Sequence, residues 1–566
     1  MTKIVDFFKK RLLLFLLLYL ILRLVKMELF LFKIDAFVLT DGLKSIFNQL
    51  VFSSIFFLFT SYLILFVFLR FRWGLLFYFI FEYFYLLVYF HYYGYFKNYF
   101  FLTPQFHNFI EGLQALSTIK FDIYLGAFFI SLIDFLPVIM LLNKELYFSF
   151  KNEFYKINGK FFIGFILSVL LLFVRELYQL KKSNSIFNYV ANVSTVHKRN
   201  TQEIVRKYGT TITAFSTIFV GFKEEKIIKE LINYGPEKVF KEKNKKYNLI
   251  LIQVESLESG VIFARYNGER IMPFLFSLTT NSWFCKSVVA YHGIGATTDA
   301  DFSIINSIEA SDKVPLFNLK TYNFPQSVAH ILNSNNFLTV AFHNNDGSYF
   351  DRKTTLRKMG FQKFYDMNEM GLKRKWWGAP DKEMFEFIKS KIVNEKEPFF
   401  YYVITMSSHG PFDQVLKEYG YTNTNIIDIL SKNDPVAFYW NAMSYVDQAL
   451  SNFVDFVLKN FDDTHIIIIG DHSPNISNSS IVFIEGERIE FVPFFFIPAR
   501  SSAYIKKFEI KDGMSQLDIL PTIIDLTGAG GVLKTYGDSI FMKEKNYIPY
   551  RRLKLDRKKI QEKINF

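Results

Sequence analysis

Side chains that can bind metals and move protons follow four apolar segments of this sequence. Glu255 ends "YNLILIQVE", His343 ends "FLTVAFH", His409 follows "FFYYVITMSS", and Asp471 and His472 follow "THIIIIG". Each apolar run has the length of a buried strand. Carboxylates and imidazoles are the groups that hold divalent cations and act as general acids or bases. The repeated pattern therefore indicates a catalytic or metal-binding site.

Helical patterns separate these apolar runs, for example "PDKEMFEFIKSKI" and "AFYWNAMSYVDQALSNFVDFVLKN". Strands that alternate with helices predict an α/β domain with a mostly parallel central sheet, covered on both faces. In such a sheet the functional site lies beyond the carboxyl ends of the strands. We therefore expect the four polar strand ends to meet on one rim.

Glu255, Asp471 and His472 offer two oxygen ligands and one nitrogen ligand. This set suits Mn²⁺ or Mg²⁺, and less well Zn²⁺. A threonine hydroxyl added as a fourth ligand would have a lowered pKa and become a nucleophile. The alternative is structural: Glu255 caps a helix or pairs with a lysine, and Asp471 and His472 form a turn. The long separations in sequence do not decide between the two.

A candidate threonine lies in "HGIGATTDADF", residues 292–302, where small residues surround Thr297 and Thr298. Glycine and alanine would let this loop approach a metal and a phosphoryl group closely. Asp299 and Asp301 are expected to be acids in the first turn of a helix, where its dipole favours negative charge. Thr298 is expected to be the N-cap of that helix.

The first 180 residues concentrate the aromatic excess of a chain that has 69 phenylalanines. Five apolar stretches, at about 12–32, 46–69, 73–93, 124–142 and 161–180, are long enough to predict membrane spans. Arg23 and Lys26 interrupt the first stretch, and we expect both to snorkel to the interface. Basic "FFKKR", "RFR" and the loop at 143–160 favour the cytoplasmic side, which places the rest of the chain outside the cytoplasm.

These features predict four regions: a five-helix transmembrane domain at 1–180, a partly helical linker at 181–246, a catalytic domain at 247–540 and a basic tail at 541–566. We expect the tail to be disordered or to rest on anionic lipid. The net charge of +13 comes without a nucleic-acid-binding motif, so it indicates a membrane surface and no nucleic acid. A single cysteine, Cys285, excludes an intramolecular disulfide.

The motifs "NLILIQVES", "HGIGATTDADF", "ITMSSHGPF", "IIIIGDHS" and "SQLDILPTI" occur in an order that resembles the lipoteichoic acid synthase family. Members of that family are membrane-anchored phosphoglycerol transferases of the alkaline phosphatase and sulfatase superfamily. The resemblance implies five amino-terminal spans in a bacterial cell membrane and an extracytoplasmic catalytic domain. It extends over essentially the whole chain.

The resemblance also implies roles for single residues. Thr297 resembles the catalytic threonine, and His409 resembles the histidine near the substrate phosphate. The implied ligands of Mn²⁺, or else of Mg²⁺ or Zn²⁺, are Glu255, Thr297, Asp471 and His472.

Arg352 resembles an arginine that holds the glycerophosphate group, and His343 matches a histidine nine residues earlier. Phe350 and Asp351 occupy substrate-binding positions where the family has tryptophan and asparagine. Two further departures are Asn345 in place of an aspartate and Asp301 in place of a glutamate. These changes leave the metal ligands intact and affect recognition of the head group.

The expected reaction transfers phosphoglycerol from phosphatidylglycerol to a hydroxyl of a glycolipid, a glycan or polyglycerolphosphate, through a phosphoryl-threonine intermediate. A phosphoethanolamine transferase and a phosphodiesterase of the same superfamily remain alternatives. A sulfatase is disfavoured, because Cys285 in "FCKSV" lacks the cysteine-x-proline-x-arginine context. A binding module without activity is disfavoured by the complete set of candidate ligands.

Overall fold

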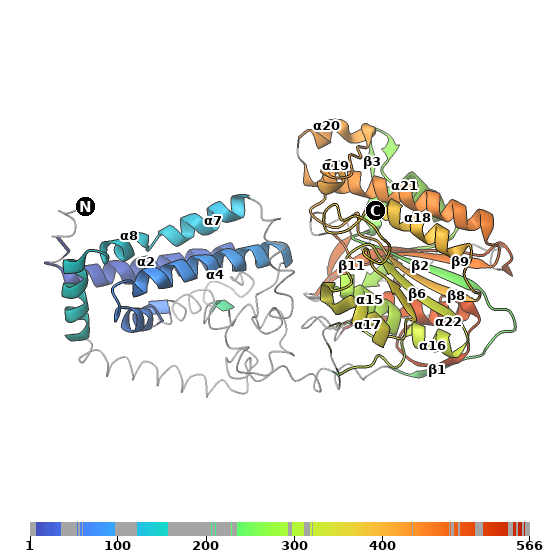
Figure 1. Cartoon of the computed structure of the whole chain (residues 1–566), viewed down its shortest axis with the longest axis horizontal. Coiled ribbons are helices and arrows are strands. Elements are labelled where there is room, and N and C mark those ends of the chain that lie inside the picture. The colour runs from blue at the N-terminus through green and yellow to red at the C-terminus, as the bar shows by residue number, and fades with distance from the viewer. Residues whose placement is uncertain are drawn as a thin grey trace. The chain divides into compact units, whose positions relative to one another are not determined.

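The computed structural model describes residues 11–34, 60–96, 121–156, 235–292, 297–310, 321–432, 434–474, 480–484, 487–503, 513–541, 547–550 and 553–556, with isolated positions besides. Contacts divide the chain into two compact units, residues 1–223 and 224–566. Helices make up the described part of the first unit, and the second unit carries a sheet with helices on both faces (Figure 1).

Among the described residues, nine strands form the central sheet of the second unit. Eight follow the order β12 (Met514–Ser515), β5 (Trp283–Ala290), β11 (Glu487–Ile497), β9 (Thr464–Gly470), β2 (Asn248–Val254), β8 (Phe399–Ile404), β6 (Leu338–His343) and β7 (Lys363–Tyr365), and β10 (Ile481–Ile484) pairs with β11. The four apolar runs predicted as strands are β2, β6, β8 and β9. They are neighbours and all parallel, which confirms the mostly parallel sheet.

The sheet is mixed because β11 runs antiparallel to both β9 and β5. Two reversals make β5 parallel to the β9–β2–β8–β6 block, so the chain leaves β5 at the same rim as it leaves β2 and β9. For the same reason the amino-terminal part of β11 lies at that rim, where Glu490 is opposite Ala290 in the register. The rim thus collects residues from both strand directions.

Alternating strand residues face two hydrophobic cores. Leu249 and Leu251 of β2 pack with α15 (Thr297–Asn306), α16 (Val328–Ser334), α17 (Arg352–Lys358) and α22 (Ile519–Thr527). Ile250 and Ile252 pack with α14 (Pro273–Asn281), α18 (Asp381–Ile392) and α21 (Pro435–Asn460). Figure 1 shows α18 and α21 on one face of the sheet and α15, α16, α17 and α22 on the other. Helices α18 and α21 confirm the two helical patterns seen in the sequence.

Two segments outside the central sheet differ from expectation. β1 (Glu237–Phe240) lies in the predicted linker and pairs with β13 (Gly531–Lys534). β14 (Tyr547–Tyr550) and β15 (Leu553–Asp556) form a hairpin within the predicted tail. Ile548, Tyr550 and Leu555 are buried there, and the Tyr291 hydroxyl donates to the Pro549 carbonyl at 2.5 Å. These residues are therefore ordered, which corrects the expectation of a disordered tail, and contact of the tail with anionic lipid stays a prediction. The remainder of the partly helical linker predicted at 181–246, residues 181–234, lies almost wholly outside the described residues.

The first unit contains α2 (Leu12–Lys33), α4 (Gly74–Phe96), α7 (Phe121–Leu132) and α8 (Phe135–Met140), and residues 144–156 are also helical. The expected spans at 12–32 and 73–93 coincide in position with α2 and α4. The stretch at 124–142 is divided between α7 and α8, and the stretch at 161–180 lies outside the described residues. Within the described part of the chain, no helix has both the length and the apolar composition needed to cross a membrane.

Arg23 and Lys26 do not extend to an interface, which corrects the expectation for them. Lys26 Nζ lies 2.6 Å from Glu82 Oε2 and 2.9 Å from Asp134 Oδ1. Arg23 Nη1 lies 3.0 Å from Asp134 Oδ2 and also contacts Glu82. All four side chains, which we call the four-charge cluster, are buried. Their opposite charges cancel inside the first unit.

The outer face of α2 is apolar although its inner face carries these charges. The large apolar residues exposed along α2 are Leu13, Leu14, Leu17, Ile21, Val25, Leu29 and Phe32. A helix on a water-soluble protein has the opposite arrangement, with its polar side chains outward.

Candidate active site

The three candidate metal ligands come from two adjacent parallel strands. Glu255 follows β2, and Asp471 and His472 follow β9. One ligand atom from each residue lies within 4.8 Å of the others, and all three side chains are buried. His472 Nε2 lies 3.5 Å from Glu255 Oε1 and 3.5 Å from Asp471 Oδ2. The fold thus brings together residues that are more than 200 positions apart in the chain.

Two atoms of this cluster are buried without a hydrogen-bond partner among the described residues, His472 Nε2 and Asp471 Oδ2. Buried polar atoms are almost always bonded, so two orphaned atoms that face one another need an explanation. Two carboxylates and one imidazole are a donor set for Mn²⁺ or Mg²⁺, and Zn²⁺ is also compatible. The residues present therefore fit a bound dication.

The charges of the cluster interact strongly. Burial opposes ionisation of Glu255, but the adjacent His472 and His409 imidazoles and the Thr297 hydroxyl hold its pKa well below the usual range. Burial also opposes protonation of His472, but Asp471 and Glu255 raise its pKa to about 10. Burial and the Glu255 charge raise the pKa of Asp471. Without a dication, protons supply the positive charge that this cluster needs.

Main-chain groups fix the orientation of the ligands. Asp471 Oδ1 accepts from the backbone N–H groups of Ser256 at 2.7 Å and His472 at 2.6 Å. His472 Nδ1 lies 3.1 Å from the Ser473 carbonyl oxygen, which can only accept, so Nδ1 donates. This bond turns Nε2 towards the carboxylates and fixes the tautomer that a metal ligand needs.

His292 and Glu490 hold His472 and the residue after it in position. The His292 ring stacks on the His472 ring with centroids 4.6 Å apart. His292 Nδ1 lies 2.9 Å from Glu490 Oε1, and Glu490 Oε2 accepts from the Ser473 N–H at 2.9 Å. Glu490 was not predicted as a site residue. Its signal was a carboxylate in an otherwise apolar strand, "EFVPFFFI", but the antiparallel direction of β11 was not predictable from that segment.

Thr297 is the first residue of α15, and its Oγ1 donates to Glu255 Oε2 at 2.8 Å. The candidate nucleophile thus contacts a candidate metal ligand directly. The amino-terminal end of a helix also favours an anion, because its N–H groups point towards the ligand. Thr298 is the second helical residue, so the expectation that it is the N-cap is wrong.

Arg352 lies in a buried network instead of an open phosphate site. Its Nε and Nη2 donate to Asp301 Oδ2 at 3.1 and 2.8 Å, and its Nη1 lies 2.5 Å from His343 Nε2. Gln253 and Tyr402 donate to the other oxygen of Asp301 at 2.7 and 2.8 Å. Asp301 is the fifth residue of α15, beyond its first turn, so its expected role at the helix start is wrong. Asp299 does lie in that first turn.

His343 is buried and both of its ring nitrogens have partners. Its Nδ1 donates to the Ile404 carbonyl at 3.1 Å, and Nε2 accepts from Arg352. Burial and the Arg352 charge hold the pKa of His343 well below its usual value, so the ring is neutral. In this arrangement His343 contacts Arg352, and a contact with substrate stays a prediction.

The other predicted substrate residues lie nearer the surface. His409 follows β8, is half-buried, and donates from Nδ1 to the Gly410 carbonyl at 2.6 Å. Burial lowers its pKa. Phe350 and Asp351 precede Arg352 and have φ angles of 51° and 50°. Such left-handed conformations are strained for residues other than glycine and occur at functional sites. Contacts of these three residues with substrate also stay predictions.

The arrangement is suited to group transfer to a hydroxyl nucleophile. A hydroxyl, a dication site and a helix amino terminus meet at the rim, and these groups can neutralise an anionic reacting group. Gln253 and Tyr402 were not predicted as site residues, whereas Asp301 was noted only as a departure from the family pattern. Their connection with the site is visible only in the fold, where Gln253 and Tyr402 share a hydrogen-bond network with Asp301 and Arg352.

Comparison with known proteins gives a consistent result. A sequence model of the sulfatase family matches residues 247–529. Lipoteichoic acid synthase 2 of Bacillus subtilis (strain 168) is 28% identical over 344 residues, which cover 56% of this chain and 51% of that protein. Lipoteichoic acid synthase of Staphylococcus saprophyticus is 29% identical over 340 residues, with the same two shares. This chain spans about half the length of these curated relatives.

One solved structure is similar over nearly the whole chain. It is the integral membrane protein lipooligosaccharide phosphoethanolamine transferase A from Neisseria meningitidis. The two share 14% sequence identity with a TM-score of 0.55, and the match covers 92% of this chain and 96% of that one. At this identity the similarity shows a shared fold.

Proposed function

This chain belongs to the sulfatase family, and on that premise we propose that it transfers phosphoglycerol from phosphatidylglycerol to a hydroxyl of a second molecule. The acceptor in this proposal is a glycolipid, a glycan or polyglycerolphosphate. One observation carries the proposal: Thr297 Oγ1 donates at 2.8 Å to Glu255, beside the buried cluster of Asp471 and His472. Similarity to proteins named lipoteichoic acid synthase supports phosphoglycerol as the transferred group.

Glu255, Asp471 and His472, with the Thr297 hydroxyl as fourth ligand, are the residues that would hold Mn²⁺, Mg²⁺ or Zn²⁺. When bound, such an ion supplies positive charge to the phosphoryl oxygens and lowers the pKa of the Thr297 hydroxyl. Glu255 Oε2 already accepts the hydrogen bond from that hydroxyl, so the oxygen is oriented before substrate arrives.

The reaction then has two balanced halves. Thr297 Oγ loses its proton and attacks the donor phosphorus; the bond from phosphorus to the diacylglycerol oxygen breaks, and that oxygen takes up a proton. In the second half the acceptor hydroxyl loses its proton and attacks the phosphoglyceryl-threonine, which releases Thr297. The acceptor receives the phosphoglycerol group and the enzyme is restored.

His409 and Arg352 assist in this scheme. Because His409 Nδ1 donates to the Gly410 carbonyl, Nε2 is the nitrogen that would exchange a proton with the substrate. Its lowered pKa keeps the ring neutral near pH 7, which suits a base for the acceptor hydroxyl. Arg352 would stabilise phosphate charge by redirecting some of its N–H groups from Asp301 and His343 to the substrate phosphate.

We also propose that the first unit lies in a bacterial cell membrane with five spans and that the catalytic unit is extracytoplasmic. The apolar outer face of α2 and the burial of the four-charge cluster support this, because charges within a bilayer must pair inside the protein. A membrane position would keep the catalytic unit close to its lipid donor.

The test uses the purified full chain in detergent with Mn²⁺ and a glycolipid acceptor. Phosphatidylglycerol, phosphatidylethanolamine and phosphatidylcholine with identical acyl chains are supplied separately, and diacylglycerol and modified acceptor are measured. Diacylglycerol and phosphoglycerol-modified acceptor are expected from phosphatidylglycerol alone. Consumption of phosphatidylethanolamine alone would replace the proposal by a phosphoethanolamine transferase. Release of free glycerophosphate without modified acceptor would replace it by a phosphodiesterase.

A further inference from the structure

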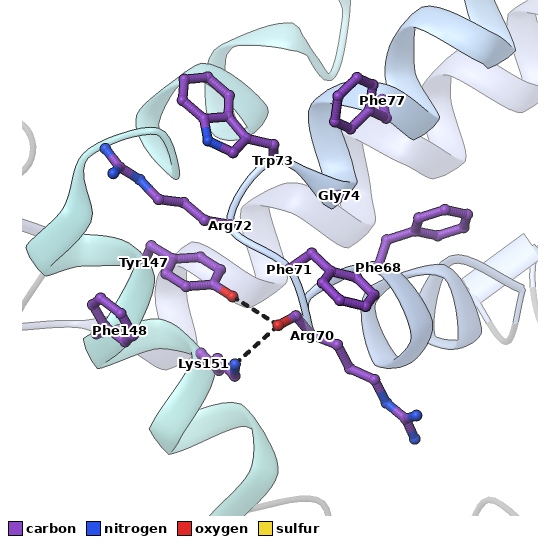
Figure 2. A pocket seen from close by; sticks show the side chains of 10 residues that line it. All are labelled: Phe68, Arg70, Phe71, Arg72, Trp73, Gly74, Phe77, Tyr147, Phe148 and Lys151. Carbon is purple, nitrogen blue, oxygen red and sulfur yellow. Dashed lines mark hydrogen bonds between the residues drawn. The ribbon is translucent and has the colours of Figure 1, made fainter.

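The first unit contains a cavity of about 670 Å³ that lies between two segments far apart in the chain (Figure 2). One wall is the turn at 68–74 that leads into α4, and the other is the helix at 144–156, which contributes Tyr147, Phe148 and Lys151. These segments contain the basic "RFR" turn and the basic loop region that the sequence assigns to one side of a membrane. The fold brings them together.

Hydrogen bonds between the walls fix their relative position. The Tyr147 hydroxyl lies 3.0 Å from the Leu69 carbonyl oxygen and 3.2 Å from that of Arg70, and Lys151 Nζ donates to the Arg70 carbonyl at 3.0 Å (Figure 2). Arg72 Nη2 donates to the Leu142 carbonyl at 2.8 Å. A Cβ on Gly74 would lie 2.1 Å from the Phe68 carbonyl oxygen, so this turn requires glycine. These contacts therefore define the conformation of the turn and, with it, the shape of the cavity.

The charged side chains that line the cavity are all cationic. Arg70, Arg72 and Lys151 line it, and no carboxylate does. Arg72 and Lys151 donate to backbone carbonyls, and within the described residues no ion pair neutralises these two side chains or that of Arg70. Each carbonyl uses one N–H of a group that has several. Arg72 and Lys151 thus keep their positive charges and spare donors for an anion, whereas the Arg70 guanidinium points away from Arg72 (Figure 2).

Most of the remaining lining is aromatic, and four of these side chains are exposed. Phe71 and Phe77 are 70% and 69% exposed, and Trp73 and Phe148 are about half exposed. The Arg72 guanidinium lies 5.5 Å from the Trp73 ring, and Lys151 Nζ lies 5.6 Å from the Tyr147 ring. Trp and Tyr beside basic residues are typical of the level of lipid headgroups. Exposed phenylalanines beside the cations offer contact to acyl chains.

We infer that this cavity binds the headgroup phosphate of an anionic glycerophospholipid, with its acyl chains against Phe71 and Phe77. Basic pockets between helices on the cytoplasmic side of a membrane protein are suited to such lipids. The inference depends on the proposed membrane position of the first unit. It concerns the leaflet opposite to the one that would supply the donor, so this site is separate from the active site.

The test measures quenching of Trp73 fluorescence in the full chain reconstituted into phosphatidylcholine vesicles. A small fraction of the lipid has brominated acyl chains and is either phosphatidylglycerol or phosphatidylcholine. Subtracting the signal of Trp73→Phe isolates Trp73 from the tryptophans of the second unit. Dication is left out, so no lipid is turned over. Brominated phosphatidylglycerol is expected to quench Trp73 at several-fold lower lipid fraction than brominated phosphatidylcholine.

Matched variants connect the preference to the cavity. Arg72→Gln and Lys151→Gln are each expected to lower the preference for phosphatidylglycerol about fivefold. Arg72→Lys, which keeps the charge, should retain most of it and shows that the turn still folds. Lys33→Gln removes an exposed charge from the carboxyl-terminal end of α2 and should leave it unchanged.

Three results would overturn the inference: equal quenching by both brominated lipids, an unchanged preference in both glutamine variants, or loss of the preference when inorganic phosphate is added, which would make this a site for free anions. The diacylglycerol assay on the same preparations separates this inference from the proposed function. Diacylglycerol release without lipid preference refutes the cavity site alone. A lipid preference without diacylglycerol release refutes the transfer reaction alone.

Discussion

Arg352 binds the Asp301 carboxylate through two of its N–H groups, at 3.1 and 2.8 Å, and both side chains are buried. Burial raises the pKa of Asp301, although Arg352 and the hydrogen bonds to Tyr402 and Gln253 oppose the rise. The ion pair therefore only partly offsets the cost of burying the carboxylate. The arginine expected to hold the substrate phosphate is anchored by the residue that departs from the family pattern.

Replacing Asp301 by asparagine should destabilise the catalytic unit by about 3–5 kcal/mol, because it leaves the buried Arg352 charge without its partner. Asp351→Asn, one residue away from Arg352 on an exposed turn, should change the free energy of unfolding by no more than about 0.5 kcal/mol. Urea denaturation of both variants measures the difference. Equal stabilities would mean that the pair contributes nothing to the fold.

Glu490→Gln should weaken Mn²⁺ binding about 10–100-fold although Glu490 is not a candidate ligand. The reason is geometric: Glu490 holds His292, whose ring stacks on His472, and it accepts from the Ser473 N–H. Titration calorimetry with Mn²⁺ gives the affinity. Glu487→Gln, in the same strand, is the control and should bind as the wild type does. Unchanged affinity in Glu490→Gln would show that these outer contacts do not orient the ligand.

Metal affinity should rise with pH between about 6 and 8. Without metal, Asp471 and Glu255 raise the pKa of His472 to about 10, so His472 holds a proton that a metal must displace. Falling pH therefore weakens binding, by about tenfold per pH unit for each proton released. Calorimetry in buffers of different ionisation enthalpy counts these protons. His330→Gln, outside the site, is the control and should show the same dependence of metal affinity on pH as the wild type. An affinity independent of pH would contradict the charge state described for the cluster.

His465 should make the fold less stable in mild acid. It is buried in β9, where Nδ1 accepts from the Ala499 N–H at 2.8 Å, and burial lowers its pKa to about 3. An unfolded histidine titrates near pH 6.5. Below that pH the unfolded state binds the extra proton, so stability falls as pH decreases, by up to about 1.4 kcal/mol per unit.

His465→Asn keeps an acceptor for Ala499 but cannot be protonated. The loss of stability between pH 7 and pH 4.5 should therefore be about 2–3 kcal/mol smaller in the variant than in the wild type. Urea midpoints at the two pH values measure it. Parallel pH curves would show that His465 does not couple folding to protons.

Much of the catalytic unit was predictable from local pattern. Buried parallel strands are continuous apolar runs, so β2, β6, β8 and β9 were recognisable one by one. Parallel neighbours end at the same rim, which is why Glu255, Asp471 and His472 could be expected to meet. The chemistry of the cluster then followed from the residue types.

The remaining features depend on contacts that no local pattern contains. Glu490 lies at the rim only because β11 is antiparallel to its neighbours. The sequence of an apolar strand does not reveal its direction in the sheet, so the position of Glu490 could not be predicted. The partners of Lys26 are 56 and 108 residues away, so its burial could not be read from α2 alone. Helix α15 begins at Thr297, two residues earlier than expected, which places Thr298 inside the helix and Asp301 beyond its first turn. In the tail, the high net charge suggested disorder. The buried Ile548 and Tyr550 alternate with less buried residues, as in a strand, but this pattern is too short to recognise in the sequence.

The central claim is that Thr297 carries the phosphoglycerol group, and the most direct measurement is the mass of the peptide that contains Thr297 and Thr298. The full chain is incubated with Mn²⁺ and phosphatidylglycerol without acceptor, quenched in acid, digested and fragmented. We predict a phosphoglycerol adduct on Thr297 that is retained in Thr298→Ala, whereas Thr297→Ala has no adduct and releases diacylglycerol about 10³-fold more slowly or worse. Diacylglycerol release by Thr297→Ala at the wild-type rate, or an adduct on Thr298, would contradict the account.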